Sequence, residues 1–408
     1  MKTTLISAIG RGRKDADGTT YSKIAYTVNG TPQPPTPFFV QAWLLSPQGA
    51  DVDRVELLGT ATSSWSALAE EFGETDLFCQ LEELCGQQDS CGVNNQHLTT
   101  LSEALSQRWK RQVRCHVLCH REVDDSEAPQ ILEQLLNLFP LEEPEREILI
   151  DTTHALRTLP LLALSAVQIA DALAPGVALR TRLLYGEFLG KDRGRAVVFN
   201  SVLENLRMSR ALSRFLDGFD ASQLATILEI NYPKLSKALL ALDACLAANT
   251  LNRLDERLSQ LRNSLPKDAS GLHDRIFSML HIVLRRLDRP TLSQRLLALA
   301  EIRAERGQFA FAILALAEAV QVLAIEKSHD RNLESYELRK QVFHDFMDSL
   351  PKDQKIALNN LLIPLRNHVA HGATFEPVNR QASITEQSQR RQWEQAHQWV
   401  KKILLEQQ

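Results

Sequence analysis

The sequence lacks a large excess of charge of either sign, and only 6% of its residues are aromatic. Its 46 basic and 50 acidic side chains leave a formal net charge of −4 over 408 residues. That balance excludes a polycation that binds nucleic acid over its whole surface, but it does not exclude a local basic patch. With 44% apolar residues the chain can bury sizeable cores, and its length suggests about two or three domains.

Long uninterrupted apolar runs are also missing. A membrane-spanning helix needs about 20 mostly apolar residues. The two longest apolar stretches each contain polar side chains, namely Gln168 and Asp171 within 159–174, and Glu318 and Gln321 within 309–325. The short run at 5–9 leads into Gly10-Arg11-Gly12-Arg13-Lys14 instead of the small-residue cleavage site of a secretion signal. We therefore expect a soluble cytoplasmic protein without a membrane segment.

The six cysteines match no zinc ribbon in their spacing, and a disulfide framework is not expected in a reducing compartment. Cys115, His116, Cys119 and His120 do place four metal-ligating side chains within six residues. However, the apolar residues between and around them predict a strand, and one face of that strand carries both cysteines. We favour a buried cysteine face over a metal site and predict no bound metal.

Strand and helix signals alternate through the first two hundred residues. The predicted strands are 3–9, 21–28, 52–58, 115–123, 148–151 and 180–185, and the predicted helices are 39–45, 65–72, 129–138 and 159–173. Asn29-Gly30 is a strong hairpin signal. This pattern predicts a mostly parallel sheet with helices on both faces, in which ligands collect at the carboxyl ends of the strands. Three small, polar or basic loops follow such strands, at 10–14, 59–64 and 152–157.

Beyond about residue 199 the strand signals vanish, and leucine and alanine recur at helical spacing. Interruptions fall at 266–271 and 288–290. We therefore predict an α/β domain at 1–204, a helical connector at 205–290 and an all-α C-terminal domain at 291–408. Helices of the last domain are expected near 292–306, 309–326, 335–346, 354–371 and 385–407.

The loop after the first strand begins Gly10-Arg11-Gly12, but it lacks the third glycine of a dinucleotide fingerprint and leads into a hairpin. A conventional NAD site is therefore not expected. Backbone donors beside Arg11, Arg13 and Lys14 suit a phosphate or another anion. The alternative is an ordinary solvated turn.

The segment from Ile150 to Pro160 is more informative, because an apolar strand ends there in hydroxyl, imidazole and guanidinium groups. Thr158 is placed to cap a helix that has Pro160 in its first turn. Free N–H groups at that helix start, with Arg157 nearby, favour an anion. His154 is either a structural hydrogen-bonding group or a ligand contact.

A third candidate is Arg366-Asn367, followed by His371 and Gly372. An arginine and a histidine can support RNA cleavage without metal, because imidazole moves a proton while guanidinium stabilises phosphorane charge. The spacing alone proves little, since it recurs at Arg111/His116 and Arg339/His344. Five residues rotate by about 140° on an ideal helix, which favours a site composed across a dimer over a self-contained one.

Together these segments resemble the CRISPR-associated CARF–HEPN effectors of type III systems, in the subgroup whose CARF domain carries a DxTHxxRxxP-like segment. The CARF resemblance rests on Leu5–Gly12, on Tyr21–Gly30 with Thr36-Pro37-Phe38-Phe39, on Leu58-Gly59-Thr60 with Ser63-Ser64-Trp65, and on Ile150–Pro160. The HEPN resemblance rests on the R-x4-H motif at Arg366 and His371, with the polar Asn367 after the arginine.

The resemblance implies a Rossmann-like CARF domain that senses cyclic oligoadenylate, with cyclic tetra-adenylate as the expected ring. It also implies a HEPN domain that cleaves single-stranded RNA without cofactor or metal, and a homodimer (or a higher homo-oligomer) that holds the ligand on its two-fold axis. The ligand-binding residues would be Gly10, Arg11, Gly12, Thr60, Ser63, Thr152, Thr153, His154 and Arg157. Arg366 and His371 would be catalytic, with Asn367 orienting them. Whether the CARF site also degrades its ligand is left open.

Two other hypotheses compete with this one. In the first, the chain is a non-catalytic nucleotide-sensing regulator with a degenerate HEPN motif, and its helical half binds a partner or DNA. Residues 231–246 would then be a recognition helix, although the segment carries only Lys234 and Lys237 as basic residues. In the second, the chain is a Rossmann-type small-molecule enzyme, which the incomplete glycine motif disfavours.

Overall fold

A computed structural model describes residues 2–10, 21–71, 73, 75–86, 93–119, 126–154, 158–248, 250–266, 271–328, 336–371 and 386–407. The chain divides into two compact units, Met1–Arg207 and Met208–Gln408. The first is mixed α/β and the second is helical, which confirms the predicted fold class. The further division of the helical part at residue 290 stays a prediction.

Unit 1 is built on one sheet with the strand order β3-β2-β8-β7-β6-β1-β4-β5. The strands are β1 (Thr3–Ile9), β2 (Ala25–Val28), β3 (Thr31–Pro32), β4 (Val52–Thr60), β5 (Gln112–Cys119), β6 (Glu147–Asp151), β7 (Thr181–Gly190) and β8 (Arg193–Val198). The five strands from β7 to β5 run parallel, β8 is antiparallel to β7, and the β2–β3 hairpin continues the sheet beyond β8.

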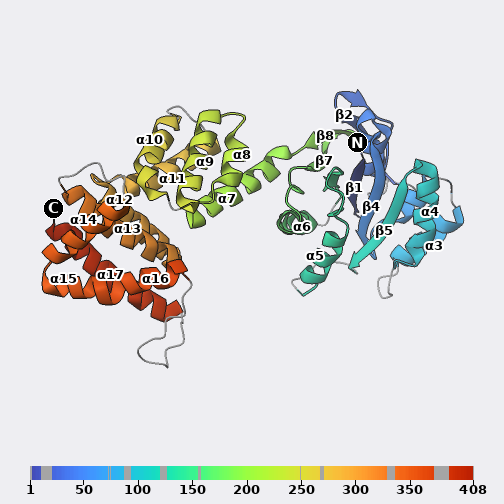
Figure 1. Cartoon of the computed structure of the whole chain (residues 1–408). Coiled ribbons are helices and arrows are strands. Elements are labelled where there is room, and N and C mark those ends of the chain that lie inside the picture. Colours follow the sequence, from blue (N-terminus) through green and yellow to red (C-terminus); the bar gives the residue numbers. More distant parts are fainter. Residues whose placement is uncertain are drawn as a thin grey trace. The chain divides into compact units, whose positions relative to one another are not determined.

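Helices cover both faces of this sheet (Figure 1). The helices are α1 (Phe39–Leu45), α2 (Ser66–Glu70), α3 (Thr75–Gly86), α4 (His97–Trp109), α5 (Ala128–Asn137) and α6 (Leu159–Leu173), with the short η1 (Pro47–Gly49) after α1. Leu5 and Ile9 of β1 pack in the core that contains α1 to α4, whereas Ile6 and Ala8 pack against α5 and α6. Because both faces are covered, every residue of β1 is buried, as is typical of a central parallel strand.

Several predicted elements need correction. The predicted strand 52–58 continues to Thr60, so Gly59 and Thr60 belong to β4 and not to the following loop. The predicted strand 115–123 begins at Gln112, and its part from residue 120 onward lies outside the described residues. Helices α3 and α4 and strand β8 were not predicted at all.

Unit 2 is a set of helices around a main apolar core that includes residues from Met208 to Leu404. The helices are α7 (Asn200–Gly218, which begins in unit 1), α8 (Ser222–Leu228), α9 (Pro233–Ala247), η2 (Leu251–Arg253), α10 (Leu254–Ser264), α11 (Gly271–Leu287), α12 (Leu292–Glu305), α13 (Phe309–Lys327), α14 (Tyr336–Ser349), α15 (Lys352–Ala357), η3 (Leu358–Leu362), α16 (Ile363–His371) and α17 (Glu386–Glu406). The core contains side chains from both sides of residue 290.

Helix α13 occupies the centre of this unit and contacts α12, α14, α16 and α17. Among the described helices it is the one long and apolar enough to cross a membrane, with a mean hydropathy of 1.9 over 18 residues. More than half of that window, 56%, is buried inside the protein. The composition of α13 is therefore that of a core helix, packed on several sides by other helices.

A single irregular helix from Lys352 to His371 carries the R-x4-H segment. Its middle turn, η3, is π-helical, and Pro364 follows two residues later in α16. Proline has no N–H and its ring clashes with the carbonyl four residues earlier, so a regular α-helix cannot continue through it without distortion. The wider π turn accommodates this proline, and such turns are frequent at functional sites.

Candidate functional site

The sheet order of unit 1 creates a topological switch point between β1 and β6. The chain builds β4 and β5 on one side of β1 and then returns to place β6 on the other side. Loops that leave the carboxyl ends of β1 and β6 therefore diverge from neighbouring positions, where open α/β sheets bind ligands. The predicted ligand loops at Gly10 and Thr152 follow these two strands.

A buried carboxylate, Asp151, ties the ends of three strands together. Its Oδ2 accepts a hydrogen bond of 2.6 Å from Ser7 Oγ on β1, and its Oδ1 accepts from both the N–H and the hydroxyl of Thr153, at 2.8 and 2.5 Å. Thr153 Oγ1 in turn accepts from the N–H of Gly186 on β7, at 2.7 Å. Burial raises the pKa of Asp151 to about 6, although these donors favour the ionised form.

His154 is held by a different part of the unit. Its Nε2 accepts a hydrogen bond of 3.1 Å from the N–H of Phe39, the first residue of α1, and its ring packs edge-on against Phe38 with centroids 5.3 Å apart. An accepting Nε2 requires the neutral ring with its proton on Nδ1. Burial lowers the pKa of His154 to about 4, which is consistent with that neutral state.

Gly10 permits the two loops to approach closely. A Cβ added to Gly10 would lie 2.3 Å from the backbone oxygen of His154, a distance that real Cβ atoms do not adopt. The carbonyl of Gly10 also accepts a hydrogen bond of 3.1 Å from the N–H of Ser64 in the loop after β4. Gly10 is therefore required by its neighbours, and its presence needs no nucleotide to explain it.

The loop after β4 is organised by its own side chains. Ser63 Oγ accepts from the N–H of Thr60 at 2.9 Å, and the indole N–H of Trp65 donates to the carbonyl of Thr60 at 2.9 Å. Gly59 lies against that indole, where a Cβ would come within 2.5 Å of the ring. The loop is thus a compact turn closed on a buried tryptophan.

The structure thus brings six of the predicted ligand residues to one edge of the sheet: Gly10, Thr60, Ser63, Thr152, Thr153 and His154. Several of their side chains are already engaged inside the fold, including Thr152 Oγ1, which donates to the carbonyl of Leu184 at 3.1 Å. Arg11, Gly12 and Arg157 lie outside the described residues, as do Arg13 and Lys14. That this edge binds a ligand stays a prediction.

One expectation at this edge was wrong. Thr158 does precede α6, and Pro160 lies in the first turn as predicted, but the hydroxyl of Thr158 makes no capping hydrogen bond. The backbone of Thr158 is itself in the right-handed helical region, with φ −83° and ψ −27°. A capping side chain normally needs an extended backbone at that position to reach back to the first free N–H groups.

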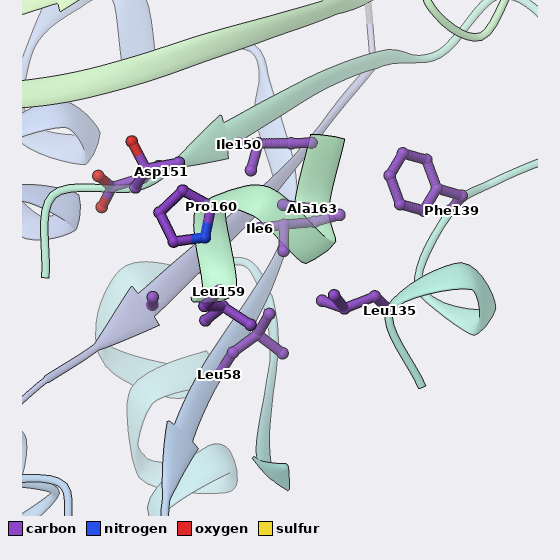
Figure 2. Close-up of a pocket in the computed structure, with 11 residues that line it drawn as sticks. Ile6, Leu58, Leu135, Phe139, Ile150, Asp151, Leu159, Pro160 and Ala163 are labelled. Atoms are coloured by element: carbon purple, nitrogen blue, oxygen red, sulfur yellow. The ribbon is translucent and has the colours of Figure 1, made fainter. Parts of the chain in front are cut away.

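Below the switch point lies a small cavity between the sheet and the helices α5 and α6 (Figure 2). Apolar side chains, among them Ile6, Leu58 and Leu159, form most of its wall, and Asp151 lies at its edge. Its volume is about 20 Å³, which is room for one water molecule. This cavity is too small to hold a nucleotide.

A much larger cavity, of about 460 Å³, lies in unit 2 where α13, α14, η3 and α16 meet. Arg366 and Asn367 line it, and the side-chain oxygen of Asn367 accepts a hydrogen bond of 3.2 Å from Arg366 Nη1. The volume is within the range of roughly 300 to 1,000 Å³ that small-molecule sites occupy. The structure therefore places two of the three predicted catalytic residues at a hollow of ligand size.

The same cavity contains residues that the sequence did not mark as functional. Glu318 of α13 and Arg339 and Lys340 of α14 line it together with Arg366. Burial raises the pKa of Glu318, and the positive charges of Arg366 and Arg339 counteract that rise. In the sequence Glu318 was visible only as the charge that interrupts an apolar run.

His371, the third predicted catalytic residue, is the last residue of α16, but its side chain lies outside the described residues. In the other described R-x4-H pair on a helix, Arg339 and His344, the two side chains lie in different surroundings. Arg339 lines the cavity, whereas His344 is exposed and lies 3.2 Å from Asp348 on the surface of α14. His344 is therefore no substitute for His371.

Within the described residues no group of three or more histidine, cysteine, aspartate or glutamate side chains is arranged to hold a metal ion. Cys115 is buried on β5, and burial raises the pKa of its thiol to about 12. At neutral pH it is therefore a protonated core side chain. The side chains of Cys119 and His120 lie outside the described residues.

No protein-family model and no curated protein matches this chain. Among solved structures it is similar to Enterococcus italicus Csm6 bound to cyclic hexa-2'-fluoro-hexa-dAMP, with 13% sequence identity. The alignment covers 100% of this chain and 94% of that chain, with a TM-score of 0.41. A similarity of this size does not establish a shared activity, so the functional conclusion rests on the chain's own residues.

The contact between Gly10 and His154 predicts that Gly10→Ala destabilises unit 1. The added methyl group must displace the backbone of residue 154, at a cost of about 2 kcal/mol in the free energy of unfolding. The matched control is Gly218→Ala at the end of α7, where the nearest atom to the new Cβ would be 3.6 Å away. Urea unfolding measures both variants. If the urea midpoint of Gly10→Ala equals that of the wild type, the close approach of Gly10 to residue 154 is contradicted.

Asp151 and His154 predict two opposite contributions to the pH dependence of stability. Because the pKa of His154 is about 4 in the folded protein and ordinarily near 6.5, its contribution falls as pH drops from 6.5 to 4. Because the pKa of Asp151 is about 6 instead of 3.8, its contribution rises as pH drops from 6 to 4. The two effects largely cancel in the wild type.

Substitutions at Asp151 and at His154 separate the two contributions to the pH dependence of stability. Asp151→Asn leaves only the histidine effect, so its unfolding free energy should drop by about 2 kcal/mol more than that of the wild type between pH 6 and pH 4. His154→Gln retains an acceptor for Phe39 and leaves only the carboxylate effect, so its stability should rise over the same interval. Urea titrations at four or five pH values measure this. Parallel profiles for the three proteins would refute the assignment.

Proposed function

We propose that this protein is a cyclic-oligoadenylate-activated endoribonuclease of the CARF–HEPN type, acting without metal in a type III CRISPR antiviral response in the cytoplasm. The observation that carries the proposal is the cavity of unit 2, where Arg366 and its hydrogen-bonded neighbour Asn367 face a hollow of about 460 Å³. The resemblance of the CARF-like segments and of the R-x4-H motif to that family suggests single-stranded RNA as the substrate.

The proposed chemistry needs one group that moves a proton and one that stabilises charge. His371 takes the proton from the RNA 2′-hydroxyl or returns one to the leaving 5′-oxygen, while Arg366 stabilises the negative charge of the phosphorane. Asn367 fixes one nitrogen of that guanidinium. Glu318 places a partly buried carboxyl group near Arg366, and the positive charge of that arginine opposes the rise that burial causes in the pKa of Glu318.

In the proposed sensor, unit 1 holds the ligand at the carboxyl edge of its sheet. The tight contacts among Gly10, His154 and Ser64 give that edge a defined shape. Arg11 and Arg157 belong to the same two loops in the sequence and supply positive charge for the ligand phosphates.

A homodimer is the proposed assembly. Large apolar side chains recur on the outer face of α6, where Leu161, Ile169 and Leu173 are 65%, 38% and 66% exposed. Their spacing places them on one stripe of the helix that follows the Thr152–His154 loop. A second copy of unit 1 would cover this stripe and bring two ligand loops to one symmetry axis.

The geometry disfavours the dinucleotide enzyme and the DNA-binding form of the regulator. A dinucleotide site would use free N–H groups at the first helix after β1, but the N–H of Phe39 at the start of α1 already donates to His154. A DNA-binding regulator would need a basic exposed face on α9. Its exposed positions Lys234 and Lys237 are followed by Leu240 and Ala244, which carry no charge.

The decisive test is RNA cleavage with and without cyclic tetra-adenylate or cyclic hexa-adenylate, in the presence of EDTA. We expect activator-dependent cleavage by the wild type and a loss of at least about 100-fold in Arg366→Ala and His371→Ala. The control is His344→Ala, which removes the surface histidine of the second R-x4-H pair and should leave the rate unchanged. Activator binding, measured by thermal shift, should persist in all three variants.

Two outcomes would count against the proposal. A strict requirement for a divalent metal would exclude the Arg/His mechanism. Absence of cleavage by the wild type with either ring, together with retained ligand binding, would favour the non-catalytic regulator instead.

A further inference from the structure

The cavity of unit 2 carries more positive charge than its proposed chemistry requires. Among the described residues, three cationic side chains line it, from Arg366 on α16 and from Arg339 and Lys340 on α14, against one carboxyl group, that of Glu318. Burial raises the pKa of that carboxyl group, and the positive charges of Arg366 and Arg339 oppose the rise. One catalytic arginine would need no further pair of cations beside it.

The two residues of α14 are not used elsewhere in the described structure. Other polar side chains of this helix do have partners: His344 lies near Asp348, Gln341 donates to Asp345, and Asp348 also accepts from Lys355 of α15. By contrast, neither Arg339 nor Lys340 has a carboxylate within ion-pair distance among the described residues. Both side chains are exposed and line the cavity.

The cavity also has an apolar wall beside these cations. Phe343, one turn after Arg339 on α14, and Val322 and Ile325 of α13 contribute to it. A phosphate group fits the cationic part, and a nucleobase or sugar fits the apolar part. Cationic side chains interleaved with an aromatic ring are a recurring arrangement for single-stranded nucleic acid.

We propose that Arg339 and Lys340 form a second phosphate subsite, which binds a phosphate of the RNA backbone other than the one at Arg366. This inference rests on the proposed ribonuclease function, because it takes Arg366 to be at the scissile phosphate. The subsite holds the strand in register and takes no part in proton transfer. Its loss therefore weakens substrate binding without slowing the bond-breaking step of bound RNA.

The test measures binding and cleavage separately. Binding is measured with a single-stranded RNA carrying 2′-O-methyl groups, whose blocked 2′-oxygen cannot attack the phosphate, at several KCl concentrations. Arg339→Ala and Lys340→Ala should each weaken binding about tenfold and reduce the slope of log affinity against log salt by about 0.7, the value for one phosphate contact to a single strand. Lys352→Ala, which removes an exposed lysine at the start of α15 outside the cavity, should leave both quantities unchanged.

Cleavage of unmodified RNA gives the second readout. In Arg339→Ala and Lys340→Ala, KM should rise about tenfold while kcat stays within twofold of the wild type. Arg339→Lys and Lys340→Arg retain the charge and should restore most of the affinity. A wild-type salt slope in both alanine variants would overturn the subsite.

The two proposals fail in different ways. If Arg366→Ala cleaves RNA like the wild type, the proposed catalytic role is wrong, whereas the salt slopes still decide whether α14 contacts phosphates. If Arg339→Ala or Lys340→Ala lowers kcat and leaves KM unchanged, the subsite is wrong and the proposed ribonuclease function is not affected. If the wild type binds no RNA, both are wrong.

Discussion

The arrangement of unit 1 depends on one buried carboxylate at the end of β6. Asp151 accepts hydrogen bonds from β1 through Ser7 and from its own loop through Thr153, which then accepts the N–H of Gly186 on β7. These bonds join three adjacent strands at the edge where the sheet reverses its order. A buried carboxyl group is costly, and its raised pKa records that cost. In exchange for that cost, the hydrogen bonds of Asp151 fix the direction of the loop that leads to His154.

His154 extends the same constraint to the opposite side of the switch point. As a neutral acceptor it occupies the first N–H of α1, so the helix that a dinucleotide would use is closed by a side chain of the protein. Gly10 then allows the β1 loop to lie directly against the backbone of residue 154. A substituted His154 would therefore affect loop position and α1 together, which makes its structural role inseparable from any ligand contact it makes.

Much of unit 1 could be predicted because its signals are local. The helix at 159–173 and the helix at 39–45 were predicted with their observed bounds, and Asn29 and Gly30 both adopt positive φ, as the hairpin signal requires. Strand β8 was missed because the turn before it is Lys191-Asp192. Both of these residues adopt positive φ, at 50° and 58°, although neither is a glycine, and the preceding Gly190 is not part of an Asn-Gly or Asp-Gly signal.

The cavity of unit 2 could be predicted only in part, because it is made by tertiary packing. Arg366 and Asn367 stand in a recognisable motif, but Glu318, Arg339 and Lys340 come from two other helices and meet them through the fold alone. Their convergence also bears on how the net charge of the chain is interpreted. A net charge of −4 is compatible with a polyanionic substrate when three cations are concentrated in one hollow. The field inside such a hollow is set by those near charges, since distant surface charges are screened within about 10 Å at 0.1 M salt. For the proposed RNA substrate, these three cations would therefore matter more than the net charge of the whole chain.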